Sequence, residues 1–299
     1  MTGKRKAGED ELTNNTAEMQ IKAAMEAIEK ASPDELMTGL GPSSAGIYIK
    51  VRPEHHPSQY QNNKADSENY LLFMYFALKG LGEVPRLILA EVGAPYDHFA
   101  IFGGEDQAIS MEWRARSPNG LLPMLSSSDD GIPYSSPICQ SGSIIRFLAK
   151  KYGLVGTSIA EETAADILYE TAKDMGGHMD KICAVMSNEE EKDMAAKLPF
   201  ASALRVEKML EKMADPNDAS AALNYGQIQL FKLLSTCEAR RAGCIRDNLS
   251  VKLDEFRIAM EKRPGIAAYL TSSVCFPYTK GELGQEGGYV YVEPFKRGS

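Results

Sequence analysis

Phe-Met-Tyr-Phe-Ala-Leu-Lys-Gly-Leu-Gly-Glu-Val-Pro-Arg, from Phe73 to Arg86, is the stretch that decides the fold. Residues 70–76 form an apolar, aromatic-rich run of strand length that ends within it. The chain then breaks at two glycines and restarts as a helix, with Pro85 in the first turn, where its missing N–H is not needed. Gly93 is expected to end this helix. Because strand ends that lead through such turns into helices are where α/β folds bind ligands, we expect a site around Tyr75.

The composition excludes several classes of protein. The chain has 299 residues, 43% hydrophobic residues and a formal net charge of −8, which argues against general nucleic-acid binding. Its five cysteines are odd in number and scattered, and its four histidines are dispersed, so no metal site is predicted. Reduced thiols and a cytoplasmic location are expected. No apolar run approaches the ~18 residues that a membrane helix needs.

Four segments are predicted along the chain. Residues 1–68 are predicted to form a largely disordered extension with a lone strand at 47–51. This extension is either a docking arm or a loosely attached tail. Residues 69–152 follow a β-α-β-α-β-β-α order, with later strands at 96–102, 121–126 and 132–134 and a hairpin turn at Asp129-Asp130-Gly131. Residues 160–272 are helical and residues 273–299 form a tail.

The helical segment is predicted as five helices. Asn224 and Gln227 are spaced as a capping box, and the pair Gly176-Gly177 is a point where the first helix can kink. The five predicted helices span residues 161–186, 189–213, 223–242, 247–262 and 266–272, and the preceding segment closes with a helix at 140–152.

The spacing of five residues resembles the start of cytosolic glutathione transferases of the sigma, mu, alpha and pi group, most closely sigma. These residues are Tyr75, Phe76, Gly80, Glu83 and Arg86. The resemblance covers about residues 69–272, including Lys262–Leu270, which resembles the family's last helical region. It implies an α/β thioredoxin-like N-terminal domain that binds glutathione, followed by an all-α C-terminal domain.

The resemblance also implies catalytic residues. Tyr75 would donate a hydrogen bond to the glutathione sulfur and favour its thiolate form. Arg86 would add a nearby cation; the alternative is a surface or salt-bridging arginine. Many relatives carry a further arginine directly after the glycine, where this chain has Leu81.

Further residues would bind the rest of glutathione. Leu122-Pro123 lies where the family has a cis-proline, and the main chain of Leu122 would pair with the cysteinyl backbone. Gln140-Ser141 opens a helix and would bind the γ-glutamyl carboxylate, or it is a plain N-cap. Two residues would serve the glycine carboxylate, Trp113 (otherwise a packing residue) and Arg116.

A glutathione transferase acting on hydrophobic electrophiles is therefore the predicted function. The resemblance also implies a homodimer in which Asp174 helps to hold the amine of the partner's glutathione. No cofactor beyond glutathione, the co-substrate, is expected, and neither a nucleic acid nor a membrane is an expected partner. A glutathione-dependent isomerase of the prostaglandin type and a non-catalytic scaffold like the lens crystallins remain as alternatives.

Overall fold

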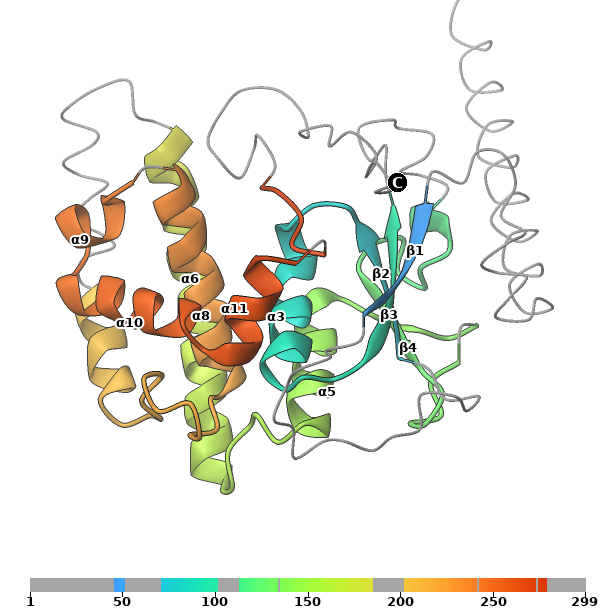
Figure 1. Cartoon of the computed structure of the whole chain (residues 1–299), viewed down its shortest axis with the longest axis horizontal. Coiled ribbons are helices and arrows are strands. Elements are labelled where there is room, and N and C mark those ends of the chain that lie inside the picture. Colours follow the sequence, from blue (N-terminus) through green and yellow to red (C-terminus); the bar gives the residue numbers. More distant parts are fainter. Residues whose placement is uncertain are drawn as a thin grey trace, which may run out of the picture. The chain divides into compact units, whose positions relative to one another are not determined.

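The computed structural model describes residues 46–51, 71–101, 113–133, 135–184, 202–240, 242–272 and 274–278. By their contacts these residues form two compact units, which are described one after the other. The sheet unit holds the described residues within 46–49, 71–76 and 97–140. The helical unit holds 50–51, 77–96 and the described residues from 141 onward (Figure 1).

The sheet unit is built around a mixed sheet of five strands in the order β1-β3-β2-β4-β5. The central strand β2 runs parallel to β3 and antiparallel to β4, and β4 is antiparallel to β5. The strands are β1 (Gly46–Val51), β2 (Leu71–Phe76), β3 (Tyr96–Ile101), β4 (Met124–Ser127) and β5 (Ile138–Cys139).

The sequence of β2 explains its central place. Its side chains are apolar on both faces, as expected of a strand covered on both sides, and Phe73 is completely buried. On the face of Phe73, the ring of His98 from β3 stacks at a centroid distance of 5.3 Å. His98 is also completely buried, and its Nδ1 lies 3.1 Å from the Phe73 carbonyl oxygen. These contacts fix the register of β2 against β3.

Two predictions about strands are wrong in detail. The segment at 47–51 is a strand, but it is not alone, because it joins the sheet as β1 beside β3. The strand predicted at 132–134 is absent from the described residues there; Ile132 makes only an isolated bridge with Ser127, and β5 takes the position beside β4. The hairpin turn at Asp129–Gly131 is confirmed, with Gly131 at a φ of 68°.

The helical unit contains two helices of the segment predicted at 69–152, one before and one after its later strands along the chain. It also contains a set of helices after residue 158. Helix α3 starts at Glu83, carries Pro85 in its first turn, and ends before Gly93, whose φ of 62° is a left-handed stop, as predicted. The helices are α3 (Glu83–Glu91), α5 (Ser141–Lys151), α6 (Ile159–Ala184), α8 (Tyr225–Arg240), α9 (Cys244–Asn248), α10 (Val251–Glu261) and α11 (Pro264–Leu270), with a further helix at 202–210 and a 3-10 turn η1 (Gly80–Gly82).

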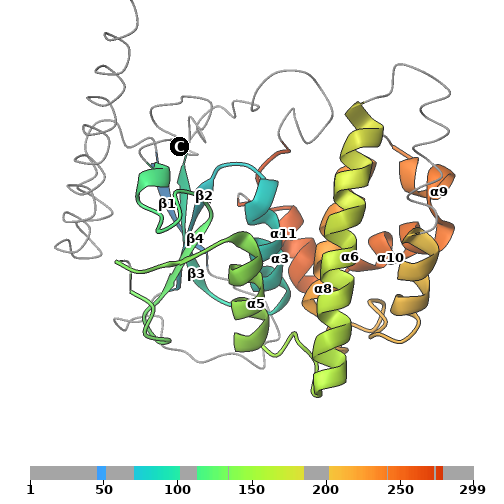
Figure 2. The ribbon, with the colours of Figure 1, turned by 180° about the vertical axis from the view of Figure 1, so that it is seen from behind.

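Helices α6 and α8 pack closely along their lengths (Figure 2). A Cβ at Gly226 of α8 would lie 2.4 Å from the carbonyl oxygen of Ala165 in α6, so only glycine permits this approach. The capping box at the start of α8 is confirmed: the Gln227 N–H donates to Asn224 Oδ1 at 3.0 Å, and the Asn224 N–H donates to Gln227 Oε1 at 3.1 Å. Helix α6 runs through Gly176 without interruption.

The predicted helix at 247–262 is two helices. Ser250 separates α9 from α10, and its hydroxyl accepts from the Leu253 N–H, an N-cap that the sequence analysis missed. The predicted helices at 161–186 and 189–213 are described only to residue 184 and from residue 202. Of the extension predicted at 1–68 and the tail predicted at 273–299, residues 1–45, 52–68, 273 and 279–299 lie outside the described residues. No described helix is long and apolar enough to span a bilayer.

Candidate functional site

Extending the strand registers by one residue places three of the predicted site residues in one row across the sheet. Met74 is paired with Met124, and Met124 with Cys139, so continuing both antiparallel registers by one residue sets Tyr75 opposite Pro123 and Pro123 opposite Gln140. Neighbouring strands lie ~4.8 Å apart, so the row from Tyr75 to Gln140 spans about 10 Å of main chain. The end of three adjacent strands therefore carries these residues side by side.

Tyr75 occupies the centre of this row. On its other side it is paired with Ala100, which is completely buried. The Tyr75 side chain is buried and its ring meets the ring of Phe76 edge-on at 5.7 Å. Its pairing with β3, and the pairing of the preceding residue Met74 with β4, hold the position of its main chain.

Leu122 and Pro123 enter the row from a turn. Ser117 and Gly120 close this turn with a main-chain hydrogen bond of 2.9 Å, and Asn119 accepts from the Leu121 N–H at 3.2 Å. The Leu122-Pro123 peptide bond is cis, and both side chains are buried. The side chain of Leu121, in contrast, is 45% exposed.

Gln140 ends the row in an unusual conformation. Its φ of 70° is a positive value, which costs a non-glycine residue conformational energy, and such residues cluster at active sites, ligand clamps and switch regions. The turn that it makes starts α5 at Ser141, so the first N–H groups of this helix follow the end of β5 directly. A helix N-terminus binds anions through these groups and the helix dipole.

Trp113 and Arg116 form an aromatic and cationic pair in the sheet unit. The Trp113 ring packs on Phe99 at 4.7 Å between centroids, and the Arg116 guanidinium carbon lies 4.2 Å from the Trp113 ring centroid. The indole is almost completely buried, and its Nε1 has no hydrogen-bond partner among the described residues. An unpaired buried donor is rare and calls for a partner.

Arg86 is fixed inside the helical unit. Its side chain is completely buried, and one amino group donates to the carbonyl oxygens of Leu78 at 2.7 Å and Lys79 at 3.0 Å. The same group pairs with Glu83 at 3.1 Å, and Nε donates to the Tyr269 hydroxyl at 3.2 Å. The Tyr269 hydroxyl donates in turn to Glu83 at 2.7 Å. These contacts favour the salt-bridging alternative for Arg86, and its predicted catalytic role stays a prediction.

Lys79, in the helical unit, is a buried charged residue that the sequence analysis did not single out. Its Nζ lies 3.3 Å from Glu83 and 4.3 Å from the centroid of the Tyr278 ring, and its main-chain N–H donates to the Pro277 carbonyl oxygen at 3.0 Å. The i,i+4 spacing of Lys79 and Glu83 was the signal that could have found it.

Asp174 is exposed on α6, the helix to which it was assigned. One and two turns before it, α6 contributes Glu170 and Asp166 to the guanidinium of Arg146 from α5. Within the described part of the chain, no group of three or more His, Cys, Asp or Glu side chains is placed to hold a metal ion.

Comparison with curated sequences finds glutathione transferases. Glutathione S-transferase 1 of Ascaris suum is 29% identical over 146 residues, which cover 48% of this chain and 58% of that protein. Glutathione S-transferase 3 of Caenorhabditis elegans is 34% identical over 122 residues, which cover 39% of this chain and 52% of the relative. These alignments thus span little more than half of the relatives. Glutathione S-transferase 2 of Onchocerca volvulus is 27% identical over 65% of this chain and 89% of its own length. No family model matches.

Comparison with solved structures gives the fold. The Pi-class glutathione S-transferase of Onchocerca volvulus matches with a TM-score of 0.53 and 25% identity, over 67% of this chain and 91% of its own. The glutathione S-transferase of Ascaris lumbricoides matches with a TM-score of 0.53 and 20% identity, over 67% and 96%. The chain has the fold of these proteins, a thioredoxin-like α/β part followed by helices, as the sequence predicted.

Proposed function

We propose that this chain is a glutathione transferase of the catalytic-tyrosine group, which conjugates reduced glutathione to hydrophobic electrophiles. The observation that carries the proposal is the row of Tyr75, Pro123 and Gln140 at one end of the sheet, followed by the N-terminus of α5. The similarity to proteins named glutathione S-transferase supports it. The assignment to the sigma-like members of this group, and the domain limits at 69–152 and 160–272, belong to the same proposal.

Tyr75 would act on the glutathione sulfur. A free thiol with a pKa of ~8.5 is only a few per cent ionised at pH 7. A hydroxyl that donates to the sulfur stabilises the thiolate, and lowering the pKa by ~2 units requires roughly 2.7 kcal/mol of differential interaction. A hydrogen bond to a charged acceptor contributes about 1.5–3 kcal/mol, so Tyr75 supplies most of this amount. The thiol proton is released to water, and the thiolate then attacks an electrophilic carbon of the second substrate, forming a carbon–sulfur bond as the carbon's bond to its leaving group (the halide, with an aryl halide) breaks and the leaving group departs with the bonding electrons.

The rest of glutathione would lie along the row. The γ-glutamyl carboxylate is proposed to accept hydrogen bonds from Gln140, Ser141 and the first N–H groups of α5. The conformation of Gln140 supports this, because a strained residue at a helix start is otherwise unexplained. The main chain of Leu122, beside Pro123, is proposed to pair with the cysteinyl backbone, as an added strand would.

The glycine carboxylate is proposed to bind at Trp113 and Arg116. The unpaired indole N–H supports this assignment, since it is a donor without an acceptor among the described residues. Asp174 is proposed to hold the amine of the partner's glutathione in a homodimer, and its exposure on α6 agrees with such a role. Glutathione is the only co-substrate proposed, with no further cofactor, and the proposed location is the cytoplasm.

Conjugation of glutathione to a generic aryl halide tests the proposal, alongside retention of the full chain on immobilised glutathione. Binding with turnover is expected. Tyr75→Phe should lower kcat about 10-fold to 100-fold, because it removes a hydrogen bond to the thiolate that is worth about 1.4–2.8 kcal/mol. Retention on immobilised glutathione should stay unchanged, because this hydrogen bond stabilises the ionised sulfur only. Full activity of this variant would refute the role of Tyr75. Binding without turnover would favour the isomerase instead.

A further inference from the structure

The start of α3 gathers two buried cations around one buried carboxylate, all three within the helical unit. Lys79 is 8% exposed, Arg86 is 0% exposed, and both pair with Glu83, which is 2% exposed. One carboxylate balances one cation, so these three side chains together carry one positive charge. Because a buried charge without a counter-charge is costly, this cluster calls for a further negative partner.

The other titratable groups around the two cations do not supply that negative charge. Burial raises the pKa of Tyr269 well above its usual value. Burial also raises the pKa of Tyr96 and that of the Cys275 thiol. These groups are therefore neutral at pH 7, and the fourth neighbour, Tyr278, is a phenol as well. The described groups that interact with the two cations thus include no second carboxylate.

One hydrogen-bond donor of the cluster also lacks an acceptor. Nη1 of Arg86 is buried and has no hydrogen-bond partner among the described residues. The rest of the guanidinium is in use, because Nη2 donates to two carbonyl oxygens and pairs with Glu83, and Nε donates to the Tyr269 hydroxyl. Buried donors without an acceptor are rare and call for a partner. The missing acceptor and the missing negative charge therefore belong to the same cluster.

The N-terminus of α3 adds to the positive potential at this place. The two carbonyl oxygens that Nη2 of Arg86 contacts are those of Leu78 at 2.7 Å and Lys79 at 3.0 Å, so the guanidinium lies at the N-terminal end of the helix. Gly82, the N-cap residue, has no side chain with which to cap it. A helix N-terminus attracts anions through its dipole and its first N–H groups.

The residues that follow α11 shield both cations from water. The Phe276 ring centroid lies 5.2 Å from the guanidinium carbon of Arg86, and the Tyr278 ring centroid lies 4.3 Å from Nζ of Lys79. The main-chain N–H of Lys79 donates to the Pro277 carbonyl oxygen at 3.0 Å, which holds this segment in place. An anion that reaches the cluster must lose its hydration shell, which favours a small monovalent ion over sulfate or phosphate.

We propose that the start of α3 binds a monovalent halide ion, ordinarily chloride, against Nη1 of Arg86 and beside the charge of Lys79. The ion supplies both the negative charge and the acceptor that the cluster lacks. The inference concerns the helical unit alone and does not depend on the proposed function. It implies that the stability of this unit depends on the concentration of halide.

Thermal unfolding of the full chain, followed by the circular dichroism of its helices, tests the site. Chloride is raised from about 1 mM to about 200 mM, while gluconate, an anion too large for a buried site, keeps the ionic strength and hence the screening constant. For a dissociation constant of about 10 mM, Tm should rise by roughly 3–7 °C and then level off. Bromide should act in the same way, and its anomalous scattering in crystals should place the ion beside Nη1 of Arg86.

Variants of Lys79 separate a bound ion from a general effect of salt. Lys79→Met removes the surplus charge while the pair of Arg86 and Glu83 stays intact, so the rise of Tm with chloride should fall below about 1 °C. Lys79→Arg keeps the charge and should keep the rise. Lys173→Met, which removes an exposed lysine of α6, is the matched control and should keep the full rise.

Three results would overturn the proposal. One is a wild-type Tm that stays the same at every chloride concentration, and another is a folded Lys79→Met variant that keeps the full rise. The third is a bromide-soaked crystal without an anomalous peak beside Nη1 of Arg86. Should Lys79→Met lose its native circular dichroism, Lys79→Gln, which keeps a hydrogen-bond donor without charge, decides by the same criterion.

Discussion

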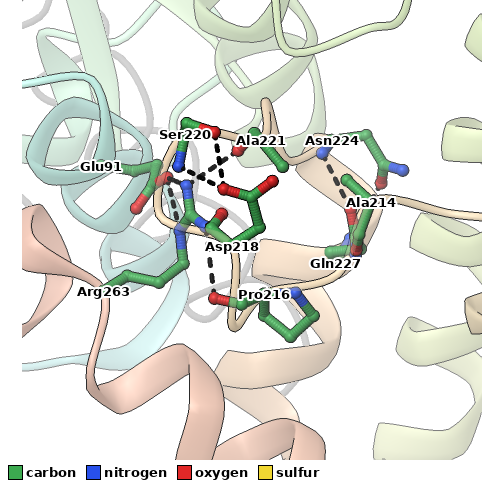
Figure 3. A network of polar contacts seen from close by, with 9 residues as sticks. All are labelled: Glu91, Ala214, Pro216, Asp218, Ser220, Ala221, Asn224, Gln227 and Arg263. Carbon is green, nitrogen blue, oxygen red and sulfur yellow. Dashed lines mark hydrogen bonds and ion pairs between the residues drawn. The ribbon is translucent and has the colours of Figure 1, made fainter.

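Replacing Arg263 by methionine should strongly destabilise the helical unit. Arg263 immediately precedes α11, and its guanidinium binds Glu91 of α3 through Nε at 2.7 Å and through one amino group at 2.5 Å (Figure 3). The two amino groups also donate to three carbonyl oxygens of the loop before α8, those of Pro216 at 3.3 Å, Asp218 at 2.8 Å and Ala221 at 3.0 Å. One side chain thus joins α3, α11 and this loop.

The expected loss follows from the burial of the pair. Arg263 is 4% exposed and Glu91 is 9% exposed, so methionine would leave a buried carboxylate without a cation. Removing one partner of a buried ion pair costs about 3–5 kcal/mol. Arg263→Lys keeps the charge but loses the planar fork that reaches Glu91 and the carbonyls together, and should cost about 1.5–3 kcal/mol.

Urea unfolding at pH 7, followed by the circular dichroism of the helices, measures both losses. The exposed Arg205 gives the matched control, because Arg205→Met should change the free energy of unfolding by less than about 0.5 kcal/mol. Glu91→Gln combined with Arg263→Met should cost clearly less than the sum of the two single changes. A loss below about 1 kcal/mol for Arg263→Met would refute the reasoning.

Two further predictions concern stability. Gly265→Ala should destabilise the fold by at least about 2 kcal/mol, because the new Cβ would lie 2.1 Å from the main-chain carbonyl oxygen of Ala90 in α3. Gly177→Ala, whose new Cβ would have nothing within 4 Å, should stabilise it by up to about 1 kcal/mol. Thermal unfolding of the two variants side by side checks both expectations. Burial alone would raise the pKa of Asp254, but hydrogen bonds from Arg257 and Arg246 outweigh it and lower that pKa. The contribution of Asp254 to the free energy of unfolding is therefore present at neutral pH and lost as pH falls below about 4. The difference in this free energy between wild type and Asp254→Asn should shrink between pH 7 and pH 3 in urea titrations. A difference that does not depend on pH would contradict this.

Local patterns predicted the elements whose signals are short-range. The apolar run ending at Phe76, the first-turn Pro85 and the left-handed Gly93 fixed the strand and helix around Tyr75 within a residue. The capping box at Asn224 was readable because both of its hydrogen bonds join residues three apart. Such features depend on propensity and spacing alone.

Sheet partners were harder to predict, because pairing depends on residues far apart in the chain. Nothing local indicates that residues 46–51 pair with β3, or that Ile138 rather than Ile132 continues beside β4. The serine N-cap of α10 was masked by a helical pattern that runs unbroken across Ser250.

The candidate site shows the same division. The sequence gives no register, so it could indicate Tyr75, Pro123 and Gln140 as separate motifs but not as one row. The choice between a catalytic and a structural arginine at position 86 required its partners, above all Tyr269, which lies 183 residues further along the chain. The burial of Lys79 beside Glu83 could be found only from the structure.

The central claim, that this chain binds glutathione and ionises its thiol, is tested most directly by calorimetric titration of the full chain with reduced glutathione. The titration is repeated at pH 7 in buffers of different ionisation enthalpy, and then with the analogue that carries a hydroxyl in place of the thiol. The account predicts one site per chain, release of a fraction of a proton on binding glutathione, and no release with the analogue. Absence of binding, or binding of both ligands without proton release, would contradict it.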